Sequence, residues 1–222
     1  MKKHILCIGD SNTHGYCAEP FDCADGGDRF NEDERWTCLL AKHLGNDYLV
    51  IEEGLGGRTT VFQDPLTEGM CCLDVLFSTM MSHEPLDLLI IMLGTNDTKE
   101  RFGVTSECIS VGMERLINKA KTVNSWRNKQ PNIFLIAPPH ILEEMCSGPF
   151  YGIMGAGCVE KSRDLASFYK AVADRTGCHF LDAEGIAEFN RTDGMHLTRK
   201  GHSALAAHLA DIVPGLVNKY EK

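Results

Sequence analysis

The sequence predicts an α/β protein of three layers, α/β/α, in which helices cover both faces of a doubly wound, parallel five-stranded sheet. Two observations support this fold class. Five short apolar runs have the length of buried strands, and segments with helical spacing of apolar residues lie between them. Because parallel strands that alternate with helices are joined by right-handed crossovers, this order favours a sheet covered on both faces.

The expected strands are residues 4–8, 48–51, 86–93, 132–137 and 179–181. The third is almost continuously apolar between Pro85 and Gly94, which is typical of a central parallel strand buried on both faces. Trp36 and Trp126 are expected in the core or at an interface. In sheets of this kind ligands bind outside the carboxyl ends of the strands, so we expect the functional site at that edge.

The expected helices are residues 36–44, 67–82, 106–125, 161–176 and 198–220. The first has a stop signal at Gly45, and His202 and His208 of the last are expected at the solvent or at an interface. Two long stretches, 13–34 and 138–158, follow neither pattern, and such stretches inside a domain are commonly functional. The second is apolar and rich in glycine, so it is expected to wall a pocket or to contact another subunit.

Composition and charge limit the classes of function. The 222 residues fit a single domain, 1–222, with 43% hydrophobic and 24% charged residues. The formal net charge of −9 argues against nucleic acid and against an anionic membrane face as partners. The apolar run at the N-terminus is too short for a signal peptide, and no stretch approaches the roughly 18 apolar residues of a transmembrane helix. We therefore expect a cytoplasmic protein.

The chain has ten cysteines but no C-x-x-C motif and no Cys/His spacing typical of zinc sites. We interpret the cysteines as reduced core thiols and expect no metal and no cofactor. A thiol or metal sensor built on these cysteines and the nine histidines is an alternative of a different class. The adjacent Cys71 and Cys72 have poor geometry for a disulfide or a shared metal, which weakens it.

Ser11 follows the first expected strand, and Asp193 and His196 precede the last expected helix. A serine hydroxyl is a weak nucleophile until a base takes its proton, and histidine suits that role because it titrates near neutrality. A carboxylate on the other ring nitrogen orients the imidazole. Taken singly, an Asp-Ser pair after a strand is more often a helix N-cap, and a D-x-x-H segment is more often a cap beside a surface histidine.

Four segments together resemble the sequence blocks of the SGNH hydrolases, the GDSL-like esterases and lipases. They are Gly9-Asp10-Ser11-Asn12, Gly54-Leu55-Gly56-Gly57-Arg58-Thr59-Thr60, Gly94-Thr95-Asn96-Asp97 and Asp193-Gly194-Met195-His196-Leu197. Their order and spacing match the family over nearly the whole chain. The resemblance is closest to the arylesterase/acyltransferase branch, which includes a mycobacterial perhydrolase-type acyltransferase. It implies the SGNH hydrolase fold with its flavodoxin-like sheet.

The resemblance also implies a role for each matched residue. Ser11 is the nucleophile, His196 is the general base and then the general acid, and Asp193 orients His196. The oxyanion donors are the N–H groups of Ser11 and Gly57 and the side-chain amide of Asn96, a neutral donor of the kind that such sites use. Further candidates for substrate contact are Asn12, His14, Leu55, Phe150, Ile153 and Met195.

The remaining polar residues of these blocks are expected to have structural roles. Asp10 is expected to hydrogen-bond local backbone, and Asp97 to cap the segment after Asn96. Arg58 is expected to pair with a carboxylate near the site or to meet another subunit.

The residue roles thus predict a serine esterase that acts through an acyl-serine intermediate. The resemblance implies short-chain, acetyl-type esters of small alcohols, aryl compounds or carbohydrates as substrates, with acyl transfer or perhydrolysis as further outcomes. A thioesterase and a lysophospholipase are alternatives within the same chemistry. A non-catalytic module that binds a small molecule or an anion at the turn near Ser11 is an alternative of another class, although the chain lacks the nucleotide-binding glycine motifs. The resemblance to the arylesterase branch also implies a homo-oligomer, for which segment 138–158 is the expected subunit contact.

Overall fold

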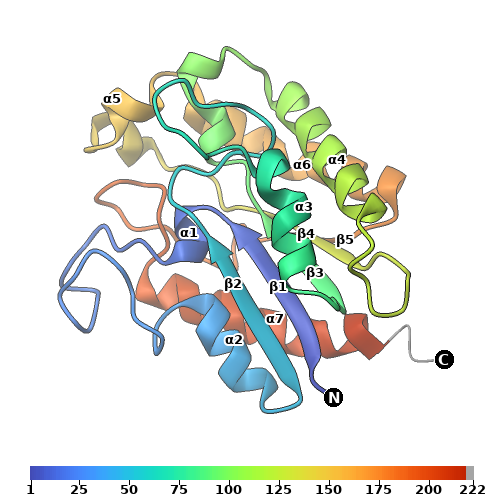
Figure 1. Ribbon diagram of the computed structural model, residues 1–222. Helices are drawn as coiled ribbons and strands as arrows, with labels where there is room; N and C mark the ends of the chain where they lie inside the picture. The colour runs from blue at the N-terminus through green and yellow to red at the C-terminus, as the bar shows by residue number, and fades with distance from the viewer. Residues whose placement is uncertain (219–222) are drawn as a thin grey trace.

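Five parallel strands form one sheet in the order β2-β1-β3-β4-β5 (Figure 1). The structure is a computed structural model that describes residues 1–218. The strands are β1 (Lys3–Gly9), β2 (Tyr48–Gly54), β3 (Leu88–Met92), β4 (Ile133–Ala137) and β5 (His179–Asp182). β2 runs beyond its prediction because Glu52 and Glu53, although polar, continue the ladder opposite Cys7 and Ile8. The strand order is flavodoxin-like, which confirms the predicted fold class.

Helices cover both faces of this sheet (Figure 1). One face is covered by α2 (Trp36–Leu44) and α7 (Arg199–Asn218), and the other by α3 (Cys72–Ser82), α4 (Ser106–Thr122) and α6 (Cys158–Thr176). α3 begins later than predicted because the preceding segment pairs with another part of the chain. Thr59 donates its N–H to the Met70 carbonyl at 2.9 Å, and Cys72 donates its N–H to the Thr59 carbonyl at 3.1 Å. The predicted end of the last helix, Tyr220, lies outside the described residues.

The two long irregular stretches contain only short elements. The first overlaps the end of α1 (Ser11–His14) and then runs as loop, which the Glu34 carboxylate ties together by accepting the N–H groups of Ala24 and Asn31. The second contains the 3₁₀ helix η3 (Glu143–Ser147) and α5 (Tyr151–Met154). Two further 3₁₀ helices, η1 (Asn96–Thr98) and η2 (Glu100–Phe102), follow β3.

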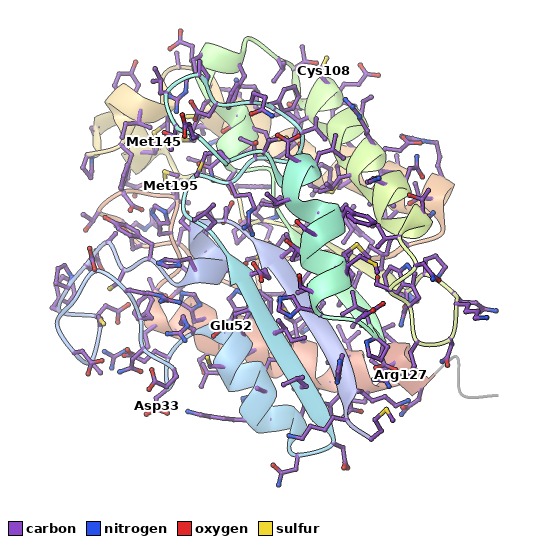
Figure 2. The ribbon with its side chains drawn as sticks, in the orientation of Figure 1. Asp33, Glu52, Cys108, Arg127, Met145 and Met195 are labelled. Atoms are coloured by element: carbon purple, nitrogen blue, oxygen red, sulfur yellow. The ribbon has the colours of Figure 1, made fainter. Side chains whose placement is uncertain are left out.

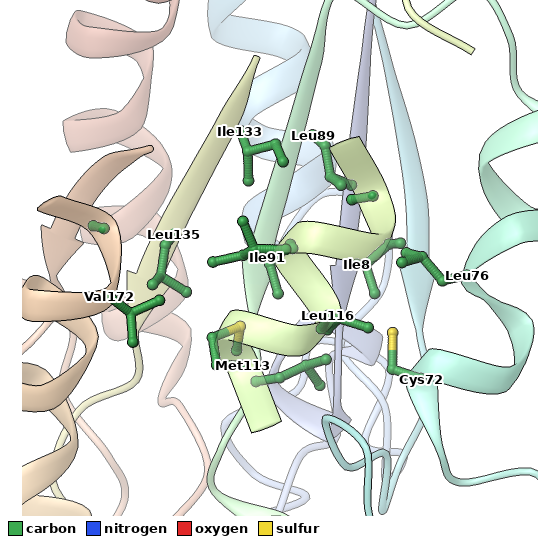
Figure 3. Packing of buried hydrophobic residues seen from close by; sticks show 14 of the residues in the cluster. Ile8, Cys72, Leu76, Leu89, Ile91, Met113, Leu116, Ile133, Leu135 and Val172 are labelled. Atoms are coloured by element: carbon green, nitrogen blue, oxygen red, sulfur yellow. The ribbon is translucent and has the colours of Figure 1, made fainter. Parts of the chain in front are cut away.

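The core lies on both faces of the sheet, and β3 contributes to both halves. Leu89 and Ile91 pack toward α3, α4 and α6, whereas Leu88 and Ile90 pack toward α2 and α7. Figure 3 shows the first of these clusters, in which β-strand residues meet Met113 and Leu116 of α4. Every residue of β3 is at most 1% exposed, which confirms the expectation of a strand buried on both faces.

The carboxyl ends of the strands meet at one edge of the sheet, and there the backbone packs very closely. A Cβ at Gly54, the last residue of β2, would lie 2.2 Å from the His14 nitrogen and 2.5 Å from the Thr13 carbonyl carbon. Because only glycine leaves room for this approach, α1 rests directly on the end of β2. The turn that carries Ser11 is therefore supported by two strands, β1 and β2.

All ten cysteines are free thiols. Cys7, Cys17, Cys23, Cys71, Cys72 and Cys158 are buried, as a core interpretation requires, but Cys108 and Cys146 are exposed and belong to no core. Trp36 and Trp126 are buried, which confirms their expected place in the core. Within residues 1–218, none of the helices combines the length and the hydropathy that crossing a bilayer requires.

Candidate active site

Ser11 begins the short helix α1 immediately after β1. Asp10 is the N-cap of that helix, and its carboxylate accepts the N–H of Asn12 at 2.9 Å, which confirms the expected bond to local backbone. The helix ends at Gly15, whose φ of 88° is in the left-handed region that favours glycine. A capped single turn thus holds the Ser11 side chain above the edge of the sheet.

Ser11, His196 and Asp193 form a continuous chain of hydrogen bonds. His196 Nε2 lies 2.8 Å from Ser11 Oγ, and His196 Nδ1 lies 2.7 Å from Asp193 Oδ2. With the ring proton on Nδ1, the imidazole donates to Asp193 and accepts the proton of Ser11. All three are buried: Ser11 is 7% exposed, His196 3% and Asp193 0%.

The Asp193 carboxylate is held ionised by its partners. Burial alone would raise its pKa, but the hydrogen bond and the charge of His196, together with the N–H of Met195 and the Asn190 amide, outweigh burial and lower the pKa. Oδ1 accepts the Asn190 amide at 2.8 Å and the Met195 N–H at 3.0 Å, which leaves Oδ2 for the imidazole. Asp193 is therefore fixed in orientation and in charge before any substrate arrives.

The imidazole opens on a cavity of about 260 Å³. Two aromatic rings flank His196: the Tyr16 centroid lies 4.5 Å from it and the Phe150 centroid 5.5 Å from it. Met195 lies with Met145 near α5, beyond the ends of the strands (Figure 2). The cavity is lined by Ser11, Tyr16, Gly56, Gly57, Asp64, Thr67, Met70, Asn96, Lys99, Arg101, Phe150, Ile153, Met154, Met195 and His196.

Two of the expected oxyanion donors lie on this cavity beside Ser11. The Nδ2 of Asn96 is buried, and none of the residues 1–218 accepts a hydrogen bond from it. A buried donor without a protein partner costs free energy unless a ligand accepts from it. Gly57 also lines the cavity, and its φ of 86° together with the 3.0 Å approach of Met70 Sδ to the position of a Cβ explains why a glycine stands there. Neutral donors beside a nucleophile are suited to a developing oxyanion.

The comparisons with known proteins agree with this geometry. The profile of the GDSL-like lipase/acylhydrolase family matches residues 7–204. The chain belongs to this family. The aryl esterase of M. smegmatis is 37% identical over 96% of this chain and 99% of its own, with a TM-score of 0.86. A carbohydrate acetylesterase from Sinorhizobium meliloti is 35% identical over 97% of this chain and 100% of its own, with a TM-score of 0.87. A search of curated protein sequences gave no match.

Of the six further substrate-contact candidates, the structure places Phe150, Ile153 and Met195 on the cavity of this acylhydrolase. Asn12, His14 and Leu55 are not among the lining residues. Asn12 is 2% exposed, and its amide donates to the Met195 carbonyl at 3.1 Å while its amide oxygen accepts the Leu197 N–H at 2.9 Å. Asn12 thus holds the His196 segment against α1 instead of facing the cavity.

Asp97 is not the cap that the sequence suggested. Its Oδ1 accepts both the N–H and the hydroxyl of Thr60, at 2.9 and 2.5 Å, so it ties the glycine block to the segment of Asn96. Burial, and then the negative charge of Asp10, raises the pKa of Asp97 to about 6 against the effect of the Thr60 hydrogen bonds. Arg58 donates to the carbonyls of Gly9 and Glu53 rather than to a carboxylate.

His202 corrects another expectation. It is fully buried, and its Nδ1 accepts the N–H of Trp36 at 3.2 Å, so it joins α7 to the start of α2. Burial, with the charges of Arg35 and His196, lowers the pKa of His202 to about 3. The ring is therefore neutral at physiological pH, and sequence spacing placed it on the wrong side of the helix. His208 is half-buried on the same helix.

The sequence analysis missed three charged residues of the cavity: Asp64, Lys99 and Arg101. Lys99 follows the Asn96 block directly, so its position after a buried strand was the available signal. Asp64 lies in a loop without any pattern, and only the fold brings it to Lys99 and Arg101. A larger hollow of about 360 Å³ beside the start of α7 contains none of the triad. Within residues 1–218, no group of three or more His, Cys, Asp or Glu side chains is placed to hold a metal.

The buried Asp97 carboxyl should make stability depend on pH. Because its pKa in the fold is about 6, the native state favours the protonated form, and this contribution is complete below about pH 4 and lost as pH rises through 6. Asp97→Asn is neutral at every pH and retains an oxygen for Thr60. We expect the stability of Asp97→Asn relative to wild type to increase by on the order of 2 kcal/mol between pH 4 and 7.

Urea unfolding at both pH values measures this difference. Asp33→Asn is the matched control, because the Asp33 side chain is 78% exposed. It should show a much smaller change with pH. A stability difference for Asp97→Asn that does not change with pH would contradict the assignment.

Proposed function

We propose that residues 1–222 form one serine esterase domain that hydrolyses short-chain acyl esters through an acyl-Ser11 intermediate. The observation that carries this proposal is the unbroken chain from Ser11 Oγ through His196 to Asp193, which opens on a cavity beside Asn96, whose Nδ2 has no hydrogen-bond partner among residues 1–218. The free cysteines favour a reducing, cytoplasmic setting.

Each residue has a defined step in the proposed reaction. His196 Nε2 takes the Ser11 proton as Oγ attacks the ester carbonyl, and Asp193 stabilises the imidazolium that forms. The N–H groups of Ser11 and Gly57 and the Asn96 amide bind the oxyanion. His196 then protonates the leaving alcohol as the tetrahedral intermediate collapses. In the second half His196 takes a proton from water, which attacks the acyl-serine, and returns that proton to Ser11 as the acid leaves.

The size of the cavity supports small, acetyl-type acyl groups. At about 260 Å³ it lies below the roughly 300–1,000 Å³ of sites for drug-sized ligands. A phospholipid acyl chain would have to extend beyond this cavity, which favours an esterase of short acyl groups over a lysophospholipase. Structural neighbours at 34–37% identity include arylesterases and carbohydrate acetylesterases, so we propose aryl, alkyl and carbohydrate esters as the substrate class.

We extend the proposal to acyl transfer. An alcohol or hydrogen peroxide can replace water as the acceptor of the acyl group from Ser11. The apolar side chains of Met70, Phe150, Ile153 and Met154 on the cavity favour an organic acceptor over water. Adding an alcohol to the hydrolysis assay and quantifying the new ester measures this outcome.

Ser11→Ala should abolish turnover of p-nitrophenyl acetate, because it removes the hydroxyl on which the acyl intermediate forms. We expect a loss of roughly 10,000-fold or more in kcat, and wild-type rates that fall from acetate to octanoate as the acyl chain outgrows the cavity. Ser147→Ala, at an exposed position on η3, is the matched control and should retain activity. Equal background rates from wild type and Ser11→Ala would refute the esterase and favour a binding module.

Asn96→Ala should lower kcat by roughly 100- to 1,000-fold and change KM little, because the amide is proposed to bind the oxyanion rather than the ground-state ester. Asn46→Ala, at an exposed turn, is the control. Steady-state kinetics with a short ester would measure both constants. A large rise in KM with kcat unchanged would instead assign Asn96 to substrate binding.

We propose a homo-oligomer whose subunit contact includes segment 138–158. Apolar side chains are exposed near the cavity: Leu66 is 74% exposed, Ile153 50% and Tyr151 44%. Light scattering should give a mass above that of one chain, and Tyr151→Asp should reduce it. Phe77→Asp, at a 54% exposed position on α3, is the control and should leave the mass unchanged. A strict monomer would contradict the proposal.

A further inference from the structure

One wall of the catalytic cavity carries three charged side chains that the proposed reaction does not use. Asp64, Lys99 and Arg101 line the same cavity as Ser11 and His196. Arg101 binds the carboxylate with two nitrogens, Nε to Oδ1 at 3.1 Å and Nη2 to Oδ2 at 2.8 Å. Lys99 Nζ donates to the same Oδ2 at 3.2 Å. We call this set the charged wall.

The charged wall holds two cations for one anion. The hydrogen bond from Arg101, above all, lowers the pKa of Asp64 far below its usual range despite burial, so Asp64 is ionised at neutral pH. Asp10, Asp97 and Arg58 lie nearby, but none of them lines the cavity. Asp193 does not line the cavity either, and its carboxylate accepts a hydrogen bond from His196. The surface that faces a substrate therefore has an excess positive charge.

Lys99 is buried so deeply that its positive charge carries a desolvation cost. Its side chain is 5% exposed and that of Asp64 is 1% exposed. Burial, and to a smaller degree the charge of Arg101, lowers the pKa of Lys99, and the hydrogen bond and charge of Asp64 with the charge of Asp97 only partly oppose that effect. A buried ammonium whose hydrogen-bonded carboxylate is shared with a guanidinium is incompletely compensated. An anion delivered to the cavity would supply the missing charge.

Both cations also have hydrogen-bond donors to spare. Among the described residues, Asp64 is the one hydrogen-bond acceptor of the Lys99 ammonium, which has three N–H groups. Arg101 uses three of its five, two with Asp64 and one from Nη1 to the Ile153 carbonyl at 2.6 Å. An incoming anion can thus bind without displacing Asp64. The last of these bonds also fixes the charged wall to α5, which carries the apolar part of the cavity.

We propose that the charged wall binds a carboxylate carried by the substrate, so that the enzyme prefers esters with one anionic group over neutral esters of the same shape. This inference rests on the proposed esterase function and names its substrate class. A single excess charge matches a carboxylate better than a phosphate dianion, and the small cavity keeps the carboxylate close to the scissile ester. Met70, Ile153 and Met154 provide apolar contact for the carbon atoms between the two groups.

Two matched pairs of esters test the proposal with the full chain. Ethyl hydrogen succinate against ethyl 4-oxopentanoate places the charge on the acyl side, and 3-acetoxybenzoate against 3-acetoxybenzamide places it on the alcohol side. We expect kcat/KM to favour the anionic member by about tenfold or more in one pair, which also identifies the side that meets the charged wall. Raising NaCl to 0.5 M should reduce the preference by screening.

Variants assign the preference to the charged wall. Lys99→Met leaves the Asp64–Arg101 pair intact and should reduce the ratio of anionic to neutral kcat/KM by about tenfold. Asp64→Asn increases the excess charge and should raise the ratio, so the two variants act in opposite directions. Lys42→Met, at a 52% exposed side chain on α2, removes the same charge outside the cavity and should leave the ratio unchanged.

The outcomes separate this inference from the function on which it rests. Turnover of neutral esters that depends on Ser11, with no preference for either anionic ester in wild type, would overturn the inference alone. A preference that persists undiminished in Lys99→Met would overturn it as well. Absence of any turnover that depends on Ser11 would overturn the esterase and the substrate class together.

Discussion

The geometry of the site depends on the two hydrogen bonds of the Asn12 side chain. Its amide reaches the Met195 carbonyl and its oxygen receives the Leu197 N–H, so a single residue joins segments that are 183 and 185 positions away. His196 lies between these two contacts. The 2.8 Å distance from Ser11 Oγ to His196 Nε2 therefore follows from the way Asn12 holds the backbone on both sides of His196. A substrate meets a site whose parts are already in place.

Charge is distributed unevenly in this molecule. The chain as a whole has a formal net charge of −9, yet the wall of its catalytic cavity carries Lys99 and Arg101 against one carboxylate. Asp10 and Asp97 are buried, and burial raises the pKa of both despite the hydrogen bonds that their carboxylates accept. Such groups do not add stability. Asp10 caps α1, and Asp97 ties the glycine block to the Asn96 segment, so buried polar groups hold the site in position at the expense of folding free energy.

The alternation of apolar strands with amphipathic helices was enough to predict the layers, the parallel sheet and nearly every element. The fully buried β3 was the clearest case. The errors arose where polar residues continue a regular element, as Glu52 and Glu53 do in β2, or where a segment with helical spacing pairs elsewhere, as before α3. His202 shows the same limit: helical spacing does not say which of two polar-looking faces meets a neighbouring helix.

By itself the sequence determined the fold class, the family and the three residues of the triad, Ser11, His196 and Asp193. These features could be identified because they depend on local patterns and on short sequence blocks in a fixed order. Only the tertiary structure decided which neighbours face the cavity. In the fold, Asn12 bonds the Met195 carbonyl instead of facing the cavity, and Asp97 accepts hydrogen bonds from Thr60. Asp64 meets Lys99 and Arg101. The physical reason is that these contacts join loops far apart in the chain, whose meeting depends on how the ends of the parallel strands are arranged in space.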